Sequence, residues 1–176
     1  MSQTPPLERA AIVLAAVVLA IAVIALASGV FAGADSATVS TQSAAGLHFA
    51  DQGDARLAPG LPHPPYDSTP PTSGPHRFAT ITGDGTRLRD DQILTAIAAG
   101  NVIVFYGTTR PPAALVRLAG PFTPALARTG LAVIFAPRRG VHGLVAIAWT
   151  RMLRAASASD PLLSQFIRSR LGIPGR

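Results

Sequence analysis

Histidines are the side chains in this sequence best suited to ligate a metal ion or to transfer a proton near neutral pH. His48, His63 and His76 lie in one Pro-rich stretch, fifteen and thirteen residues apart, and His142 lies in an expected turn. These separations differ from local ligand spacings such as His-x-x-x-His. We therefore expect no cofactor, and we keep a transition metal ion bound by His48, His63 and His76 as the alternative.

A polar motif follows a run of prolines and ends at the third histidine. Thr72 and Ser73 can hydrogen-bond to nearby backbone groups. Gly74 permits a positive φ, and Pro75 then holds His76 rigidly. Ser73 and His76 suggest a nucleophile and a base, but in a Pro-locked loop they need not face each other, and no acid is placed to orient the histidine. We therefore expect a structural motif and no catalytic residues. The motif comprises Pro70, Pro71, Thr72, Ser73, Gly74, Pro75 and His76.

The composition excludes several kinds of chemistry. The chain has no cysteine, which excludes disulfides, thiolate catalysis and cysteine-ligated zinc or iron–sulfur sites. It contains no phosphate-binding glycine loop, EF-hand loop or dinucleotide fingerprint. Its net charge of +6 comes from fifteen Arg and no Lys, against eight Asp and one Glu. Binding to anionic lipid or nucleic acid rests on this charge alone, and the sparse aromatic residues among the arginines argue against nucleic acid.

The N-terminal region predicts one transmembrane helix over residues 10–34. Twenty-two residues without a charge run from Ala10 to Phe31. At about 1.5 Å per residue they reach roughly 33 Å, enough to cross a hydrocarbon core of about 30 Å. Arg9 places residues 1–9 in the cytoplasm. A cleaved signal peptide is the competing interpretation, but its apolar region is usually shorter. The anchor residues that we single out are Ala10, Leu14, Val18, Ile21, Ile24 and Phe31.

The rest of the chain divides into three parts by composition. Residues 35–46 are small, polar and aperiodic, which predicts a flexible tether. Residues 47–76 form a Pro-rich extended arm, because the seven prolines between Pro59 and Pro75 prohibit helix and most strand pairing. Residues 77–176 have a globular pattern. The sequence thus predicts an anchor, a tether, an arm and a single α+β domain.

Apolar periodicity within 77–176 predicts three helices and three strands. The first two strands are separated by about 24 residues with a helix between them, which favours a parallel crossover. A short turn separates the second and third strands, which indicates that they run antiparallel. The fold class is α+β, with a small mixed sheet covered on at least one face. The predicted helices are 90–99, 111–119 and 161–171, with a short helical turn at Thr123-Pro124, and the predicted strands are 131–136, 144–149 and 102–106.

Residues 65–76, PYDSTPPTSGPH, resemble the signature of an uncharacterised bacterial family, domain of unknown function 3105. The resemblance extends over 49–175. Phe49-Ala50-Asp51-Gln52-Gly53 is similar to the opening Phe-x-x-Gln-Gly of the family, 101–106 to its central strand, and Ala136-Pro137 and Ala148-Trp149 to its later Ala-Pro and Ala-Trp pairs. The resemblance implies a single-pass protein of the bacterial cytoplasmic membrane, with its N-terminus in the cytoplasm and its C-terminal domain periplasmic or extracellular.

The departures from the family pattern concern its polar residues. Where the pattern has Gly-x-x-His-Ile, this chain reads Gly53-Asp54-Ala55-Arg56-Leu57. Where it has His-x-Leu-Glu-His-Gly, this chain reads Thr95-Ala96-Ile97-Ala98-Ala99-Gly100. Arg, Thr and Ala cannot replace imidazole as ligands, so His76 alone is retained from this polar set. The resemblance therefore implies that the scaffold is kept and the site is lost.

These observations together predict a non-enzymatic, single-span protein whose extracytoplasmic domain docks on a partner. Residues 35–176 carry only fourteen Arg and eight Asp, fewer charges than is usual for a free domain. An extended Pro-rich arm is suited to lie along another protein. We expect the partners to be the lipid bilayer and an integral membrane protein complex, of which the protein is an accessory subunit. We expect no nucleic acid, and no small-molecule substrate is identified. A His-dependent metal-binding protein is the alternative.

Overall fold

The computed structural model describes residues 43–81, 85–122 and 130–175. The predicted transmembrane helix over 10–34, most of the tether over 35–46 and the helical turn expected at Thr123-Pro124 lie outside these ranges. Within the described ranges, no helix is long and apolar enough to cross a bilayer. The anchor therefore stays a prediction from the sequence.

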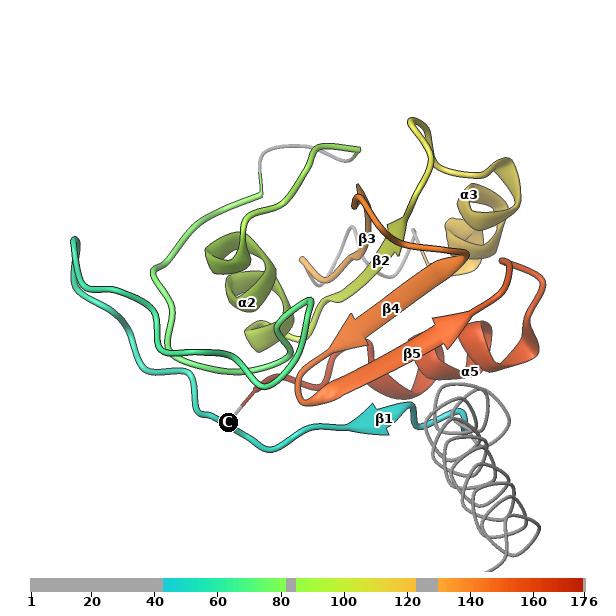
Figure 1. Ribbon diagram of the computed structural model, residues 1–176. Coiled ribbons are helices and arrows are strands. Elements are labelled where there is room, and N and C mark those ends of the chain that lie inside the picture. Colours follow the sequence, from blue (N-terminus) through green and yellow to red (C-terminus); the bar gives the residue numbers. More distant parts are fainter. Residues whose placement is uncertain (1–42, 82–84, 123–129, 176) are drawn as a thin grey trace, which may run out of the picture. The chain divides into compact units, whose positions relative to one another are not determined.

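Five strands form one mixed sheet in the order β1-β5-β4-β2-β3 (Figure 1). β2 (Val102–Tyr106) and β3 (Val133–Pro137) are parallel neighbours, as the crossover between them predicted. β4 (Leu144–Ala148) pairs antiparallel with β2 on its other side. β5 (Arg151–Ala155) pairs antiparallel with β4, and the two-residue β1 (Leu47–His48) pairs antiparallel with β5 at the edge of the sheet.

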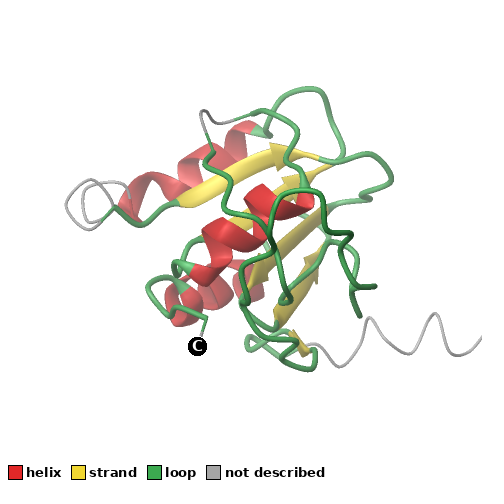
Figure 2. Ribbon diagram, turned by 90° about the vertical axis from the view of Figure 1, so that its left-hand side faces the viewer, coloured by secondary structure: helices red, strands yellow, loops and turns green. Residues whose placement is uncertain are grey.

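Helices cover both faces of this sheet, as Figure 2 shows. α2 (Asp90–Ala98) packs Ile93, Leu94 and Ile97 on one face, and all three side chains are fully buried. α3 (Ala113–Ala119) and α5 (Pro161–Arg170) pack on the other, together with the short 3-10 helix Gly120–Phe122. A strand buried on both faces needs apolar side chains at every position. This is why β2 and β4 are continuous apolar runs, with every residue buried.

Local signals set the ends of the helices. The Asp160 carboxylate accepts a hydrogen bond from the N–H of Leu162 at 2.9 Å, and Pro161 follows it, so α5 begins with an N-cap and a proline at its first position. Asp90 and Asp91 lie in the first turn of α2, where the helix dipole favours negative charge. The predicted helix over 90–99 ends one residue earlier in the structure.

The sheet differs from the prediction in two respects. β5 was not predicted, because its sequence Arg-Met-Leu-Arg-Ala interrupts the apolar run with arginines, and β1 has only two residues. β3 and β4 run in opposite directions, as expected, but they are not neighbours, because β2 lies between them. The connection from β3 to β4 therefore crosses the end of β2, where the N–H of Arg138 donates to the carbonyl of Tyr106 at 2.9 Å.

The Pro-rich segment is not an arm that extends from the domain. Residues 42–176 form one compact unit, which includes the whole of 47–76. The segment is an irregular ordered loop without helix, as its prolines predicted. Residues 70–74 of its second half are buried, and Thr72 and Ser73 are fully inaccessible. The loop makes backbone hydrogen bonds inside the fold, such as that from the N–H of Thr150 to the carbonyl of Thr72 at 2.8 Å.

Candidate functional site

The motif loop, residues 65–76, is built around two buried hydroxyl groups. Ser73 is fully buried; its hydroxyl donates to the carbonyl of Ala50 at 3.0 Å and accepts from the N–H of Gln52 at 3.1 Å. Thr72, also fully buried, shares a 3.1 Å hydrogen bond between hydroxyls with Ser68. The Ser73 hydroxyl thus donates one hydrogen bond and accepts another, which link the motif loop to residues 50–52. It forms no hydrogen-bonded pair with His76.

The motif loop is joined to residues 50–57 by a ladder of backbone hydrogen bonds. The N–H of Gly74 donates to the carbonyl of Gly53 at 2.8 Å, and the N–H of His76 to that of Ala55 at 3.0 Å. The carbonyl of His76 in turn accepts from the N–H of Leu57 at 3.0 Å. The opening Phe-x-x-Gln-Gly segment and the motif loop are thus two halves of one structural unit.

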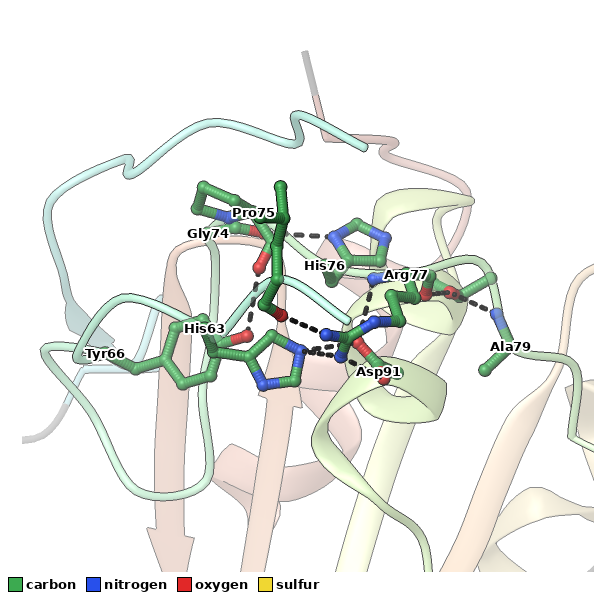
Figure 3. Close-up of polar contacts among 10 residues, drawn as sticks. His63, Tyr66, Gly74, Pro75, His76, Arg77, Ala79 and Asp91 are labelled. Carbon is green, nitrogen blue, oxygen red and sulfur yellow. Dashed lines mark hydrogen bonds and ion pairs between the residues drawn. The ribbon is translucent and has the colours of Figure 1, made fainter. Parts of the chain in front are cut away.

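Gly74 is required where the loop meets an aromatic ring. Its φ is +127°, and a Cβ atom there would lie 2.8 Å from Cε1 of Tyr66. The Tyr66 hydroxyl donates to the carbonyl of Pro75 at 3.0 Å (Figure 3). Partial burial, with a smaller contribution from Asp90 and Asp91, raises the pKa of Tyr66 to about 12. This phenol therefore stays protonated over the physiological range and acts as a hydrogen-bond donor.

His76 lies at the end of the loop with its side chain turned inward, 4% exposed. Its Nδ1 is 3.0 Å from the carbonyl oxygen of Gly74. Because a carbonyl oxygen can only accept, Nδ1 carries the ring proton. No other described residue makes a hydrogen bond to the ring, so Nε2 is the atom of this histidine left for a ligand. The ring lines a cavity of about 280 Å³.

This cavity gathers the positions at which the resemblance places the family's polar residues. Arg56 stands where the family pattern has a histidine after the first glycine, and Thr95, Ala98 and Ala99 stand where it has His, Glu and His. All four line the cavity beside His76. The sequence pattern alone did not show that these segments meet. The structure brings them together, and two of the four side chains are methyl groups.

The two polar replacements in the cavity serve other purposes. The Thr95 hydroxyl accepts from the N–H of Ala79 at 3.1 Å and donates to the carbonyl of Arg77 at 3.3 Å, which fastens the segment after the motif to α2. The Arg56 guanidinium lies over the ring of Phe78, 4.7 Å from its centroid. Phe78 is 60% exposed. Ala98 and Ala99 thus contribute methyl groups to the cavity wall, Asp54 is the acidic residue among its lining residues, and Arg56 stacks on Phe78 beside them.

An ion-pair cluster, formed by His63, Arg77 and Asp91, lies next to the motif loop (Figure 3). The Asp91 carboxylate accepts from the N–H of Arg77 at 2.8 Å and lies 2.8 Å from Nε2 of His63. The Arg77 guanidinium is 3.5 Å from the second carboxylate oxygen and 3.1 Å from the same Nε2. A protonated ring nitrogen cannot also accept, so the shorter contact indicates that His63 donates to Asp91.

The electrostatics of this cluster favour the ionised form of Asp91. Partial burial acts to raise the pKa of Asp91. This effect is outweighed by the hydrogen bond from the Arg77 backbone, then by that from His63, and by the charges of both residues. Together they hold the pKa of Asp91 below its usual range. Arg77 also donates to the carbonyl of Leu61. The cluster thus ties residues 61–63, in the middle of the Pro-rich loop, to the first turn of α2.

The three histidines of the alternative metal site do not come together. His48 lies on β1 at the sheet edge, His63 pairs with Asp91, and His76 lines the cavity. Among the described residues, no group of three or more His, Asp or Glu side chains is placed to hold a metal ion. The exposed His142 lies in the connection between β3 and β4.

Comparison with known proteins identifies the family. Residues 63–173 match a family described as protein of unknown function, DUF3105. The chain belongs to this family. Neither a curated protein nor a solved structure matches it. The DUF3105 match includes the motif loop and the strands β2 to β5, and it leaves out β1.

Two site residues were missed by sequence reasoning. Neither Asp91 nor Arg77 was singled out from the sequence. Their contact with His63 joins positions 14 and 28 residues apart, which no local spacing rule connects. The available signal was the position of Asp91 at a helix start, where a carboxylate can accept from a neighbouring chain segment.

Proposed function

We infer that this DUF3105 protein is a non-enzymatic docking module: a single-span protein anchored by residues 10–34 whose extracytoplasmic domain binds an integral membrane protein as an accessory subunit of a larger complex. One observation carries this proposal. The cavity to which the family's polar positions converge has Ala98 and Ala99 in its wall, and its histidine has no acidic hydrogen-bond partner to orient it. General acid–base chemistry needs such an oriented pair.

The rim of the same cavity has the composition of a protein-binding surface. Phe78 is the most exposed of the large apolar side chains in the described residues, and Arg56 stacks on it. Aromatic residues and arginine are enriched in protein–protein interfaces, and they account for much of the binding energy. The excess of Arg over Asp outside the anchor favours a partner with an acidic surface. We therefore propose that the partner packs an apolar side chain against Phe78 and a carboxylate against Arg56.

Site-specific photo-crosslinking of the full-length protein in its own membranes tests this proposal. A crosslinker at position 78 is expected to capture an integral membrane protein, and Arg56→Ala is expected to reduce that product at least severalfold. Position 116 gives the matched control, because Val116 on α3 is also an exposed apolar residue, 50% accessible. No product from position 78, or the same product from both positions, would contradict the proposal, as would recovery of a protein that is alone and monodisperse in mild detergent.

A further inference from the structure

A second cavity region, distant in sequence from the motif loop, lies at the carboxyl ends of the parallel strands β2 and β3. Two adjoining cavities of about 250 and 410 Å³ share Arg87, Arg138 and Arg139 in their walls. We call this region the arginine cleft. Its larger part is within the range of about 300–1,000 Å³ that is typical of ligand sites. In sheets with parallel strands, ligands bind preferentially beyond the carboxyl ends of the strands.

Three separate chain segments build the arginine cleft, and each is fixed to the sheet. The N–H of Gly85 donates to the carbonyl of Phe135 on β3 at 3.0 Å, and Leu88 is buried in the core, so Arg87 is held between two attachment points. Arg138 follows β3 directly, and its guanidinium lies 5.4 Å from the ring centroid of Phe105. These contacts fix the backbone at Arg87 and the guanidinium of Arg138 before any ligand binds.

The third segment, 107–109, requires a glycine for its close approach to the chain. A Cβ atom at Gly107 would lie 2.1 Å from the carbonyl oxygen of Val141, in the connection that crosses the end of β2. Thr108 and Thr109 follow and also line the cleft. The Thr108 hydroxyl donates to the carbonyl of Arg110, which closes this turn. The backbone of this turn and the Thr109 side chain thus lie beside the three arginines.

The charge of the arginine cleft is not balanced within the described part of the chain. No Asp or Glu of that part lines either cavity, and both ion pairs found there involve Asp91, in the first turn of α2. Three guanidinium groups around one cleft repel each other, and this repulsion is relieved when an anion binds between them. Guanidinium groups match the geometry of phosphate oxygens, to which they donate paired hydrogen bonds.

We propose that the arginine cleft is a binding site for a phosphoryl group, held by Arg87, Arg138 and Arg139 and by the turn that follows β2. The group belongs to a phospholipid head or to a small soluble phosphate, since both present the same oxygen atoms. This site is independent of the docking surface around Phe78. It gives the domain a ligand-binding function in addition to partner binding.

Hydrogen exchange of the full-length protein in nanodiscs tests this assignment and distinguishes the two sources. Inorganic phosphate is added to phosphatidylcholine nanodiscs, with sodium chloride adjusted to constant ionic strength. In the second arm, phosphatidylglycerol replaces half of the lipid and no phosphate is added. Protection of 85–88, 107–109 and 138–139 by phosphate indicates a soluble ligand, and protection in the anionic nanodiscs alone indicates a lipid head group. Either result supports the site.

The double variant Arg138→Gln/Arg139→Gln is expected to lower the affinity for the ligand that gives protection by at least about tenfold, since each lost charge-assisted hydrogen bond contributes more than a neutral one. Arg168→Gln on α5 removes one charge on the other face of the sheet and is expected to change binding less than about twofold. Unchanged exchange in β2 and β4 confirms that a variant is folded, and Arg87→Gln replaces the double variant if it is not. Absence of protection in both arms, or equal loss in Arg168→Gln, overturns the proposal.

Discussion

The ion-pair cluster and the arginine cleft use the same side chain in opposite ways. In the cluster, the Arg77 guanidinium lies 3.5 Å from the Asp91 carboxylate and also contacts a backbone carbonyl, so its charge is satisfied by the fold. In the cleft, Arg87, Arg138 and Arg139 have no carboxylate among the lining residues that the structure describes. The difference separates two functions: the first arginine holds a loop in place, and the others remain available for a ligand.

The largest loss of stability is expected from a substitution in the motif loop, where the geometry leaves no room for a side chain at Gly74. Gly74→Ala is expected to lower the free energy of unfolding by about 3 kcal/mol, because it adds both an unfavourable φ and a contact of 2.8 Å with Tyr66. Chemical denaturation measures the loss. Gly60→Ala is the matched control, since Gly60 has a φ of +85° but nothing within 4 Å of an added Cβ, and it should cost about 1 kcal/mol. Equal losses would show that the loop does not pack on Tyr66.

Asp91→Asn tests the charge balance of the cluster. We expect a loss of about 1–2 kcal/mol at neutral pH, because a carboxylate that accepts from Arg77 and His63 is replaced by a neutral amide. The folded-state pKa of Asp91 is lowered, so the unfolded chain binds the proton more tightly. The contribution of Asp91 is therefore present above the ordinary carboxyl pKa and is lost as the pH falls through the lowered value.

Urea denaturation of wild type and Asp91→Asn over the acidic range measures this pH dependence. The difference in stability between the two proteins should shrink as the pH falls, since the wild type alone loses this contribution. Asp54→Asn is the control, because Asp54 is exposed and makes no ion pair with the described residues. A constant difference at every pH would mean that Asp91 stabilises the fold by packing and not by charge.

Arg138→Gln should have the smallest effect on stability. Removal of one of the three clustered charges relieves repulsion among them, and this gain offsets the lost stacking of Arg138 on Phe105. The free energy of unfolding is therefore expected to change by less than about 0.5 kcal/mol. Arg77→Gln, which breaks the pair with Asp91, should instead destabilise by about 1–2 kcal/mol. Thermal unfolding at low salt compares them. Similar losses of stability in the two variants would show that Arg77, paired with Asp91, and Arg138, without a carboxylate beside it, do not differ in their contribution to the fold.

The sequence predicted the elements that depend on local patterns. The strand over 102–106 has the bounds that were predicted, and the helices over 90–99 and 161–171 each end one residue earlier. Capping residues, prolines and apolar periodicity act within a few residues of each other, so a single sequence contains them in full. β5 and the two-residue β1 are the exceptions: arginines interrupt the apolar run of β5, and β1 is too short to show a pattern.

The candidate site was only partly predictable, because its residues come from segments that are far apart in the sequence. His76 was singled out from its motif, and the departures at Arg56, Thr95, Ala98 and Ala99 were noted one by one in the sequence. That these positions form the wall of one cavity depends on the ladder between the motif loop and residues 50–57, and on the packing of α2. The arginine cleft likewise requires three segments separated by about twenty to thirty residues to meet at the end of β2. Contacts over such separations are set by strand order and layer packing, which no local pattern encodes. The sequence by itself therefore determined the helices, the buried strands and the family resemblance, and only the tertiary structure decided which polar side chains pair and which remain available.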